Sequence, residues 1–183
     1  MKGKVVLVTG ANGGLGTYVT QAFVDAGATV VGTSRKIQQS DFNNPNFTAL
    51  PAEISTREGA QTLVDQVVAR FGKFDVLAHT VGGFAGGQSI ADTDDATFQR
   101  MFDLNLNSVF HILRAALPPL RQTGQGCIIA IGSRAALEPG PGVWPLQRFQ
   151  GRHGLAAEDR GAREQRRGAD RKRDFAWHDG YPS

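Results

Sequence analysis

The sequence predicts an α/β fold whose doubly wound parallel sheet is incomplete at its C-terminal edge. Short aliphatic runs alternate with helical patterns from residue 4 to about residue 136, and a glycine-rich turn follows the first run. After residue 143 the chain has no valine or isoleucine, so this part cannot supply further buried strands. We therefore predict one domain over residues 1–143 and an atypical Arg- and Gly-rich tail over residues 144–183, with the composition of a solvated or disordered segment.

Five apolar runs predict the strands, because each is short and is bounded by glycine or polar residues, as buried parallel strands are. They cover residues 4–9, 28–33, 74–81 and 126–131, with a less apolar fifth run at 46–51. Apolar residues at helical spacing predict helices between these runs, at residues 14–26, 56–71 and 94–120.

Composition and charge restrict the class of protein. The chain has 183 residues and a formal net charge of +3, and most of its arginines lie between Arg148 and Arg173. No apolar stretch has the length of a membrane span and no leader-like cleavage site follows the N-terminus, so we expect a cytoplasmic protein without a membrane partner. The lone cysteine, Cys127, lies in an apolar run, which predicts a small buried hydrophobe rather than a redox centre or metal ligand. No metal site is expected.

The glycine-rich turn is the first candidate for a binding site. Residues 9–16 read TGANGGLG and join the first predicted strand to the first predicted helix. Glycines there let backbone N–H groups and the positive end of the helix dipole approach a pyrophosphate closely. Such spacing also occurs in tight turns that bind nothing, so the preceding strand and the following helix are the evidence for a dinucleotide site.

The turn resembles the T-G-x-x-x-G-x-G motif of the short-chain dehydrogenase/reductase family, which Thr9, Gly10, Gly14 and Gly16 match position for position. This resemblance implies a Rossmann-type fold that binds NAD(P)(H) and acts on a small-molecule alcohol or carbonyl compound. Residues 75–82 resemble the strand of that family that ends in N-N-A-G, although three residues depart from it: His79, Thr80 and Val81.

The resemblance also implies which cofactor the site prefers. Where an acid after the second strand would bind the ribose hydroxyl of NAD, this chain has Ser34 and Arg35, and a guanidinium suits the 2′-phosphate of NADP. We expect NADP(H) to be favoured over NAD(H), the alternative being that Arg35 and Lys36 are solvated loop charges. Glu53 and Ile54 take the place of the family's Asp-aliphatic pair beside the adenine. The expected cofactor-binding residues are Gly10, Asn12, Gly14, Leu15, Gly16, Ser34, Arg35, Glu53, Ile54, Thr80 and Gly82.

For catalysis, the resemblance implies that Ser133 orients the substrate oxygen and that Asn105 supports the proton relay. Taken alone, Asn105 is more typical of a helix surface or cap, and Ser133 of a polar strand end, than of a catalytic site. The family places a tyrosine thirteen residues after the serine and a lysine four residues further, so that the lysine brings the phenol, with a free pKa of about 10, into range for proton transfer. These positions hold Leu146 and Gln150, neither of which transfers a proton. We therefore expect catalysis by this chain to be severely reduced or absent.

A shifted reading frame would explain both the missing pair and the changed composition. Read from the second nucleotide of each codon, the span from Trp144 to Gln150 can encode a tyrosine at 146 and a lysine at 150. The hypothesis is that an inserted or lost nucleotide near codon 144 replaced a reductase C-terminus.

Three functions stay open on the sequence. The first is the family oxidoreductase activity, and the second is a catalytically silent dinucleotide-binding module. The third is nucleic-acid binding through the basic tail, which is opposed by the acidic residues that interrupt that tail: Glu158, Asp159, Glu164, Asp170 and Asp174. The resemblance implies a homo-oligomer assembled through the helix around Asn105 and the helix that carries the tyrosine and lysine.

Overall fold

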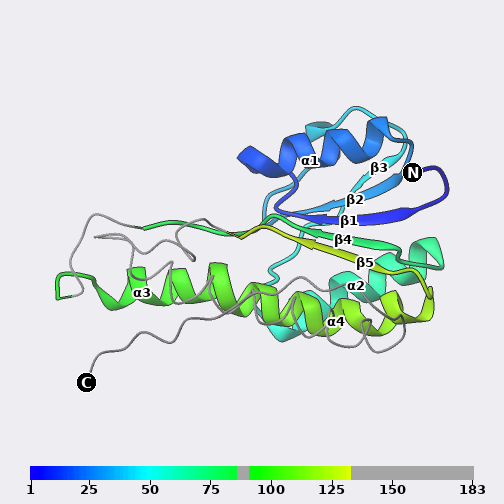
Figure 1. Cartoon of the computed structure of the whole chain (residues 1–183). Coiled ribbons are helices and arrows are strands. Elements are labelled where there is room, and N and C mark those ends of the chain that lie inside the picture. Colours follow the sequence, from blue (N-terminus) through cyan, green and yellow to red (C-terminus); the bar gives the residue numbers. More distant parts are fainter. Residues whose placement is uncertain (86–90, 133–183) are drawn as a thin grey trace, which may run out of the picture.

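A parallel sheet of five strands lies at the centre of the computed structural model, which describes residues 1–85 and 91–132 (Figure 1). The strands are β1 (Val5–Thr9), β2 (Thr29–Thr33), β3 (Phe47–Ala49), β4 (Val76–His79) and β5 (Cys127–Ala130). Their spatial order is β3-β2-β1-β4-β5, and each neighbouring pair is parallel. The chain changes direction across the sheet at β1, so the carboxyl ends of β1 and β4 flank the switch point at which such sheets bind ligands.

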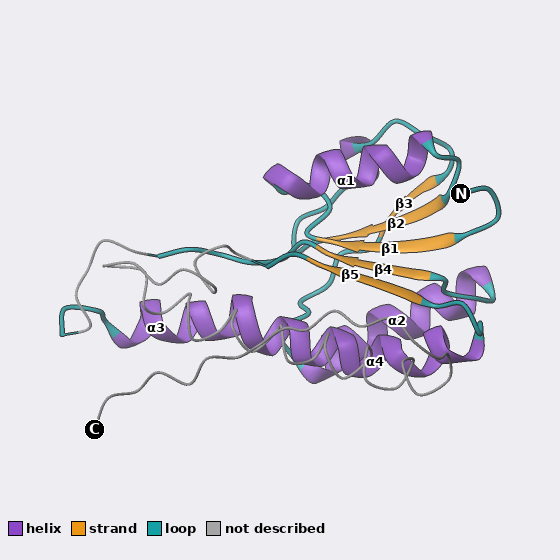
Figure 2. Ribbon diagram, viewed as in Figure 1, coloured by secondary structure: helices purple, strands orange, loops and turns teal. Residues whose placement is uncertain are grey.

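Helices cover both faces of this sheet (Figure 2). On one face lies α1 (Gly14–Asp25), and on the other α2 (Arg57–Phe71) packs beside α4 (Ser108–Gln122). The helix α3 (Asp95–Phe102) continues into α4 through one π-helical turn, η2 (Asp103–Asn107). A 3₁₀ turn, η1 (Gln39–Asp41), precedes β3.

The alternation of side chains along the strands divides the core into two layers. Val5 and Leu7 of β1 pack with the buried faces of α2 and α4, whereas Val6 and Val8 pack on the α1 side. The same alternation directs Thr9, at the carboxyl end of β1, toward the α2 and α4 side. Both faces of β1 are thus buried, which is why this strand reads as an unbroken apolar run.

The ends of α2 are specified by its own sequence. Thr56 caps the N-terminus, since its hydroxyl accepts a hydrogen bond from the Gly59 amide at 3.1 Å. At the other end Gly72 has a φ of 71°, a left-handed conformation that glycine adopts without steric cost. The Thr56 cap fixes the position of the loop before α2, which contributes to the site described below.

A buried carboxylate joins β1 and β4 at their amino ends. Asp75 accepts a hydrogen bond from the Val5 amide at 2.8 Å and forms ion pairs with Lys4 at 3.1 Å and Lys73 at 3.2 Å. Burial alone would raise the pKa of Asp75, but the hydrogen bond from Val5 and the two ammonium groups together hold that pKa below its ordinary value of 3.8. The ionised form therefore stabilises the folded sheet.

The predicted α/β fold is confirmed, and the weak strand at residues 46–51 is present as the short strand β3. The predicted helix at 94–120 is interrupted by the π-helical turn and extends to Gln122. The prediction that Cys127 is buried was wrong: β5 is the edge strand of the described sheet, and Cys127 is exposed there. Within the described ranges, no helix combines the length and the apolar character needed to cross a membrane.

Candidate functional site

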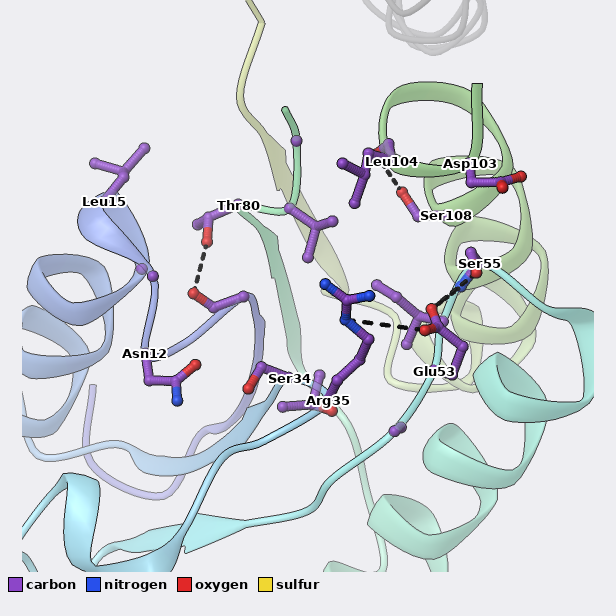
Figure 3. A pocket seen from close by; sticks show the side chains of 18 of the residues that line it. Asn12, Leu15, Ser34, Arg35, Glu53, Ser55, Thr80, Asp103, Leu104 and Ser108 are labelled. Atoms are coloured by element: carbon purple, nitrogen blue, oxygen red, sulfur yellow. Dashed lines mark hydrogen bonds and ion pairs between the residues drawn. The ribbon is translucent and has the colours of Figure 1, made fainter. Parts of the chain in front are cut away.

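A pocket of about 420 Å³ lies at the carboxyl ends of β1, β2 and β4 (Figure 3). All eleven residues expected to bind a cofactor line it, although they come from four separate segments of the chain. The parallel sheet explains this convergence, because its strands deliver their carboxyl ends to one edge. That these residues bind a cofactor stays a prediction.

The floor of the pocket is the glycine turn between β1 and α1. Gly10 has a φ of 71°, and its amide donates to the Thr33 carbonyl at 2.7 Å, which ties the turn to the end of β2. A Cβ on Gly16 would overlap the Gly10 carbonyl, so α1 can pack this close to the turn only with glycine at that position. By contrast, a Cβ on Gly14 would meet no heavy atom within 4 Å.

The first turn of α1 faces this opening with its backbone N–H groups. Gly13 occupies the N-cap position and offers no side chain to accept their hydrogen bonds, and the first turn carries no acidic residue. The N-terminal end of a helix has a partial positive charge, so the turn is arranged to accept an anionic group.

Two hydrogen bonds join β4 to β1 beside the turn. Thr80 Oγ1 donates to the Thr9 carbonyl at 2.7 Å, and the hydroxyl of Thr9 lies 2.8 Å from Nδ1 of the buried His79. His79 and Thr80 are two of the residues that depart from the N-N-A-G pattern. The structure shows that in this chain they connect the two strands that flank the switch point.

One ion pair crosses the pocket away from the glycine turn. Nε of Arg35 lies 4.0 Å from Oε2 of Glu53, and the two side chains are 73% and 48% exposed (Figure 3). The other carboxylate oxygen of Glu53 accepts hydrogen bonds from the Ser55 hydroxyl at 2.8 Å and the Ser55 amide at 3.2 Å. The sequence analysis singled out both partners but not their contact.

Asn105 is buried in the π-helical turn and fastens the loop after β4. Its side-chain Oδ1 accepts from the Gly83 amide at 3.1 Å, and Nδ2 donates to the carbonyls of Gly83 and Met101, each at 3.0 Å. The contribution of Asn105 to a proton relay stays a prediction. The other residues on which the catalytic expectations depend, Ser133, Leu146 and Gln150, lie outside the described residues, as does the tail at 144–183.

Several lining residues were not anticipated from the sequence: Gly13, Thr33, Ala52, Ser55, Val81, Asp103, Leu104 and Ser108. Most are immediate neighbours of anticipated residues, so proximity in the chain could have indicated them. The exceptions are Asp103, in the π-helical turn, and Ser108, the first residue of α4. The hydroxyl oxygen of Thr33 is buried and has no hydrogen-bond partner among the described residues.

Comparisons with known proteins agree with this geometry. A family model described as short chain dehydrogenase matches residues 4–145. L-fucose dehydrogenase of Mus musculus is 32% identical over 136 residues, which make up 72% of this chain and 49% of that protein. The 7alpha-hydroxysteroid dehydrogenase of Escherichia coli K12 is 29% identical over 143 residues, covering 74% of this chain and 55% of that protein. The chain thus spans about half the length of the curated relatives it matches.

Solved structures show the same likeness. An NADH-dependent reductase A1-R′ complexed with NAD is 26% identical, with a TM-score of 0.78 over 90% of this chain and 74% of that one. A short-chain type dehydrogenase/reductase from Mycobacterium ulcerans is 25% identical, with a TM-score of 0.78 over 88% of this chain and 64% of that one.

Proposed function

The chain belongs to the short-chain dehydrogenase family, and we propose that its pocket binds a nicotinamide dinucleotide, NADP(H) in preference to NAD(H). The observation that carries this proposal is the convergence of the glycine turn, Arg35, Glu53 and the end of β4 on one pocket at the switch point of the sheet.

The residues present fit such a ligand. The open space at Gly14 and the uncapped N–H groups of α1 suit a pyrophosphate, which needs close backbone approach and positive potential. The Thr33 hydroxyl, which has no partner in the part of the chain that the structure describes, offers a hydrogen bond to a ligand in the pocket. The preference for NADP(H) is supported by Ser34 and Arg35, which follow β2 where an acid would favour NAD(H).

We further propose that redox chemistry by this chain is absent or severely reduced. When bound, the nicotinamide supplies or accepts the hydride in an alcohol and carbonyl interconversion. The chain would orient the substrate oxygen through Ser133, while Asn105 holds the loop after β4 against the π-helical turn. The chain lacks the family's proton donor and its activating lysine, because Leu146 and Gln150 stand where the family has its tyrosine and lysine.

Two measurements test these proposals separately. Titration of the protein into NADPH, followed by nucleotide fluorescence, should show saturable binding, and no binding at about 1 mM cofactor would overturn the first proposal. NADPH consumption with a panel of aldehydes and ketones should not exceed the uncatalysed rate. A turnover of about 1 s⁻¹ or more with any of them would overturn the second proposal and leave the first intact.

A further inference from the structure

The pocket is lined by few charged side chains, and two of them, Arg35 and Glu53, lie at the end where the adenosine of the proposed ligand would bind. Among the described lining residues, Arg35 is the one cation, while Glu53 and Asp103 are anions. Lys36 follows Arg35 in the chain but does not line the pocket. A ligand that brings an additional phosphate to this end of the pocket therefore depends on Arg35, which is paired with Glu53.

The carboxylate of Glu53 is held in place, whereas the guanidinium of Arg35 is not. Two hydrogen bonds from Ser55 fix one oxygen of Glu53, and the backbone carbonyl of Glu53 accepts a further bond from the Thr56 hydroxyl at 3.2 Å. Arg35 is 73% exposed, and Glu53 is its one ion-pair partner in the described structure. The side chain of Arg35 is drawn across the pocket to a fixed anion (Figure 3).

This arrangement makes Glu53 a competitor for the guanidinium. A 2′-phosphate would bind the guanidinium of Arg35, whose Nε is paired with Glu53, so phosphate binding competes with this ion pair. A ribose with a free 2′-hydroxyl brings no charge, and a hydroxyl can donate a hydrogen bond to a carboxylate. Glu53 therefore disfavours the phosphorylated ligand relative to the unphosphorylated one.

We infer that Glu53 is a selectivity-determining residue that opposes Arg35: it restrains Arg35 and lowers the preference of the pocket for a 2′-phosphate. This inference rests on the proposed function, since it concerns the ligand that the pocket was proposed to bind. Glu53 acts on the phosphate through Arg35, so its effect must disappear when Arg35 is removed.

The test compares two ligands that differ by one phosphate, adenosine 2′,5′-bisphosphate and adenosine 5′-monophosphate, by isothermal titration calorimetry on the full chain. Glu53→Gln keeps the size of the side chain and an oxygen that can accept from Ser55, and removes the charge. Because the Arg35–Glu53 ion pair is exposed, the effect should be small. We expect the ratio of bisphosphate affinity to monophosphate affinity to rise about two- to fivefold in Glu53→Gln. Affinity for the monophosphate should stay equal or fall.

Two controls separate this effect from others. Glu58→Gln removes the same charge from an exposed glutamate in the first turn of α2, outside the pocket, and should change the ratio less than about twofold. In the double variant Arg35→Gln with Glu53→Gln, the gain should be lost relative to Arg35→Gln alone. Equal thermal unfolding midpoints would show that the variants are folded.

The outcomes distinguish failure of this inference from failure of the proposed function. An unchanged or lower ratio in Glu53→Gln, or the same gain without Arg35, overturns the inference while dinucleotide binding stands. If the unaltered chain binds neither these ligands nor NADPH, the proposed function fails and the inference fails with it.

Discussion

Asn105 and Gly83 are joined by two hydrogen bonds, one from the Gly83 amide to Oδ1 at 3.1 Å and one from Nδ2 to the Gly83 carbonyl at 3.0 Å. The side-chain amide thus pairs with the backbone of the loop after β4 as a second peptide group would. Because Asn105 is buried in the π-helical turn between α3 and α4, this pairing connects the long helix to the rim of the pocket. Both partners lie near the switch point of the sheet.

Replacement of Asn105 by alanine should therefore destabilise the fold. The change leaves the Gly83 amide and carbonyl without these partners, at a cost of about 2 kcal/mol in the free energy of unfolding. Urea denaturation measures this difference. The matched control is Asn107→Ala in the same turn, where the lost bond to Asp103 is half-buried, and its cost should be smaller. Equal costs for the two variants would contradict this account.

Alanine at two glycines of the turn should have opposite effects on the stability of the protein. In Gly14→Ala the new methyl group points into open space and the helix gains a better helix former, so stability should be kept or raised by up to about 1 kcal/mol. NADPH affinity should fall at least about tenfold, since the methyl group occupies the space proposed for the pyrophosphate.

Gly16→Ala should instead reduce the stability of the protein, because its Cβ would overlap the Gly10 carbonyl and force α1 away from β1. Thermal unfolding and NADPH titration of both variants make the comparison. Loss of stability in Gly14→Ala, or an unaltered midpoint in Gly16→Ala, would show that the packing of the turn differs from the one described.

Acid should weaken the sheet through Asp75. The folded state lowers the pKa of this carboxyl, so the stabilisation is present above the unfolded value of 3.8 and is lost as the pH falls through the lower folded value. Asp75→Asn should cost about 2 kcal/mol at pH 7, and its free energy of unfolding should change less below about pH 4 than that of the unaltered protein. Urea denaturation at a series of pH values measures both effects.

His111 provides the reference for that pH series. Burial and the nearby charge of Arg114 lower the pKa of His111 below 6.5, so the folded state favours neutral imidazole and loses stability as the pH falls through the region below that value. This loss occurs at higher pH than the loss due to Asp75, and Asp75→Asn should leave it in place. If Asp75→Asn removed the loss of stability in both pH ranges equally, the assignment of the lower range to Asp75 would be contradicted.

The features that the sequence predicted correctly are those that depend on residues close together in the chain. The apolar strands and the glycine-rich turn between β1 and α1 each depend on neighbouring positions, so their local patterns sufficed. The contact of Arg35 with Glu53 and that of Asn105 with Gly83 join residues about twenty positions apart, and no local pattern encodes them. The prediction that Cys127 is buried was wrong for a related reason: an apolar run does not reveal whether its strand lies at the centre or the edge of a sheet.

The reading frame after codon 143 offers the last prediction. Leu146 and Gln150 stand at the positions of the family's proton donor and its activating lysine, and the composition changes at the same place. If a nucleotide was inserted or lost near codon 144, the coding DNA read from the second nucleotide of each codon should specify tyrosine at 146 and lysine at 150. Sequencing codons 140 to 183 decides this.

A gene repaired to that frame should yield a chain that consumes NADPH with carbonyl substrates, with a rate gain of about 100-fold or more from the restored acid and base. The matched control restores the frame with phenylalanine at position 146, which keeps the ring and removes the hydroxyl, and it should stay inactive while binding NADPH as before. If the offset frame contains neither tyrosine nor lysine, the tail belongs to the gene as it stands, and the proposed loss of redox chemistry is a property of the protein itself.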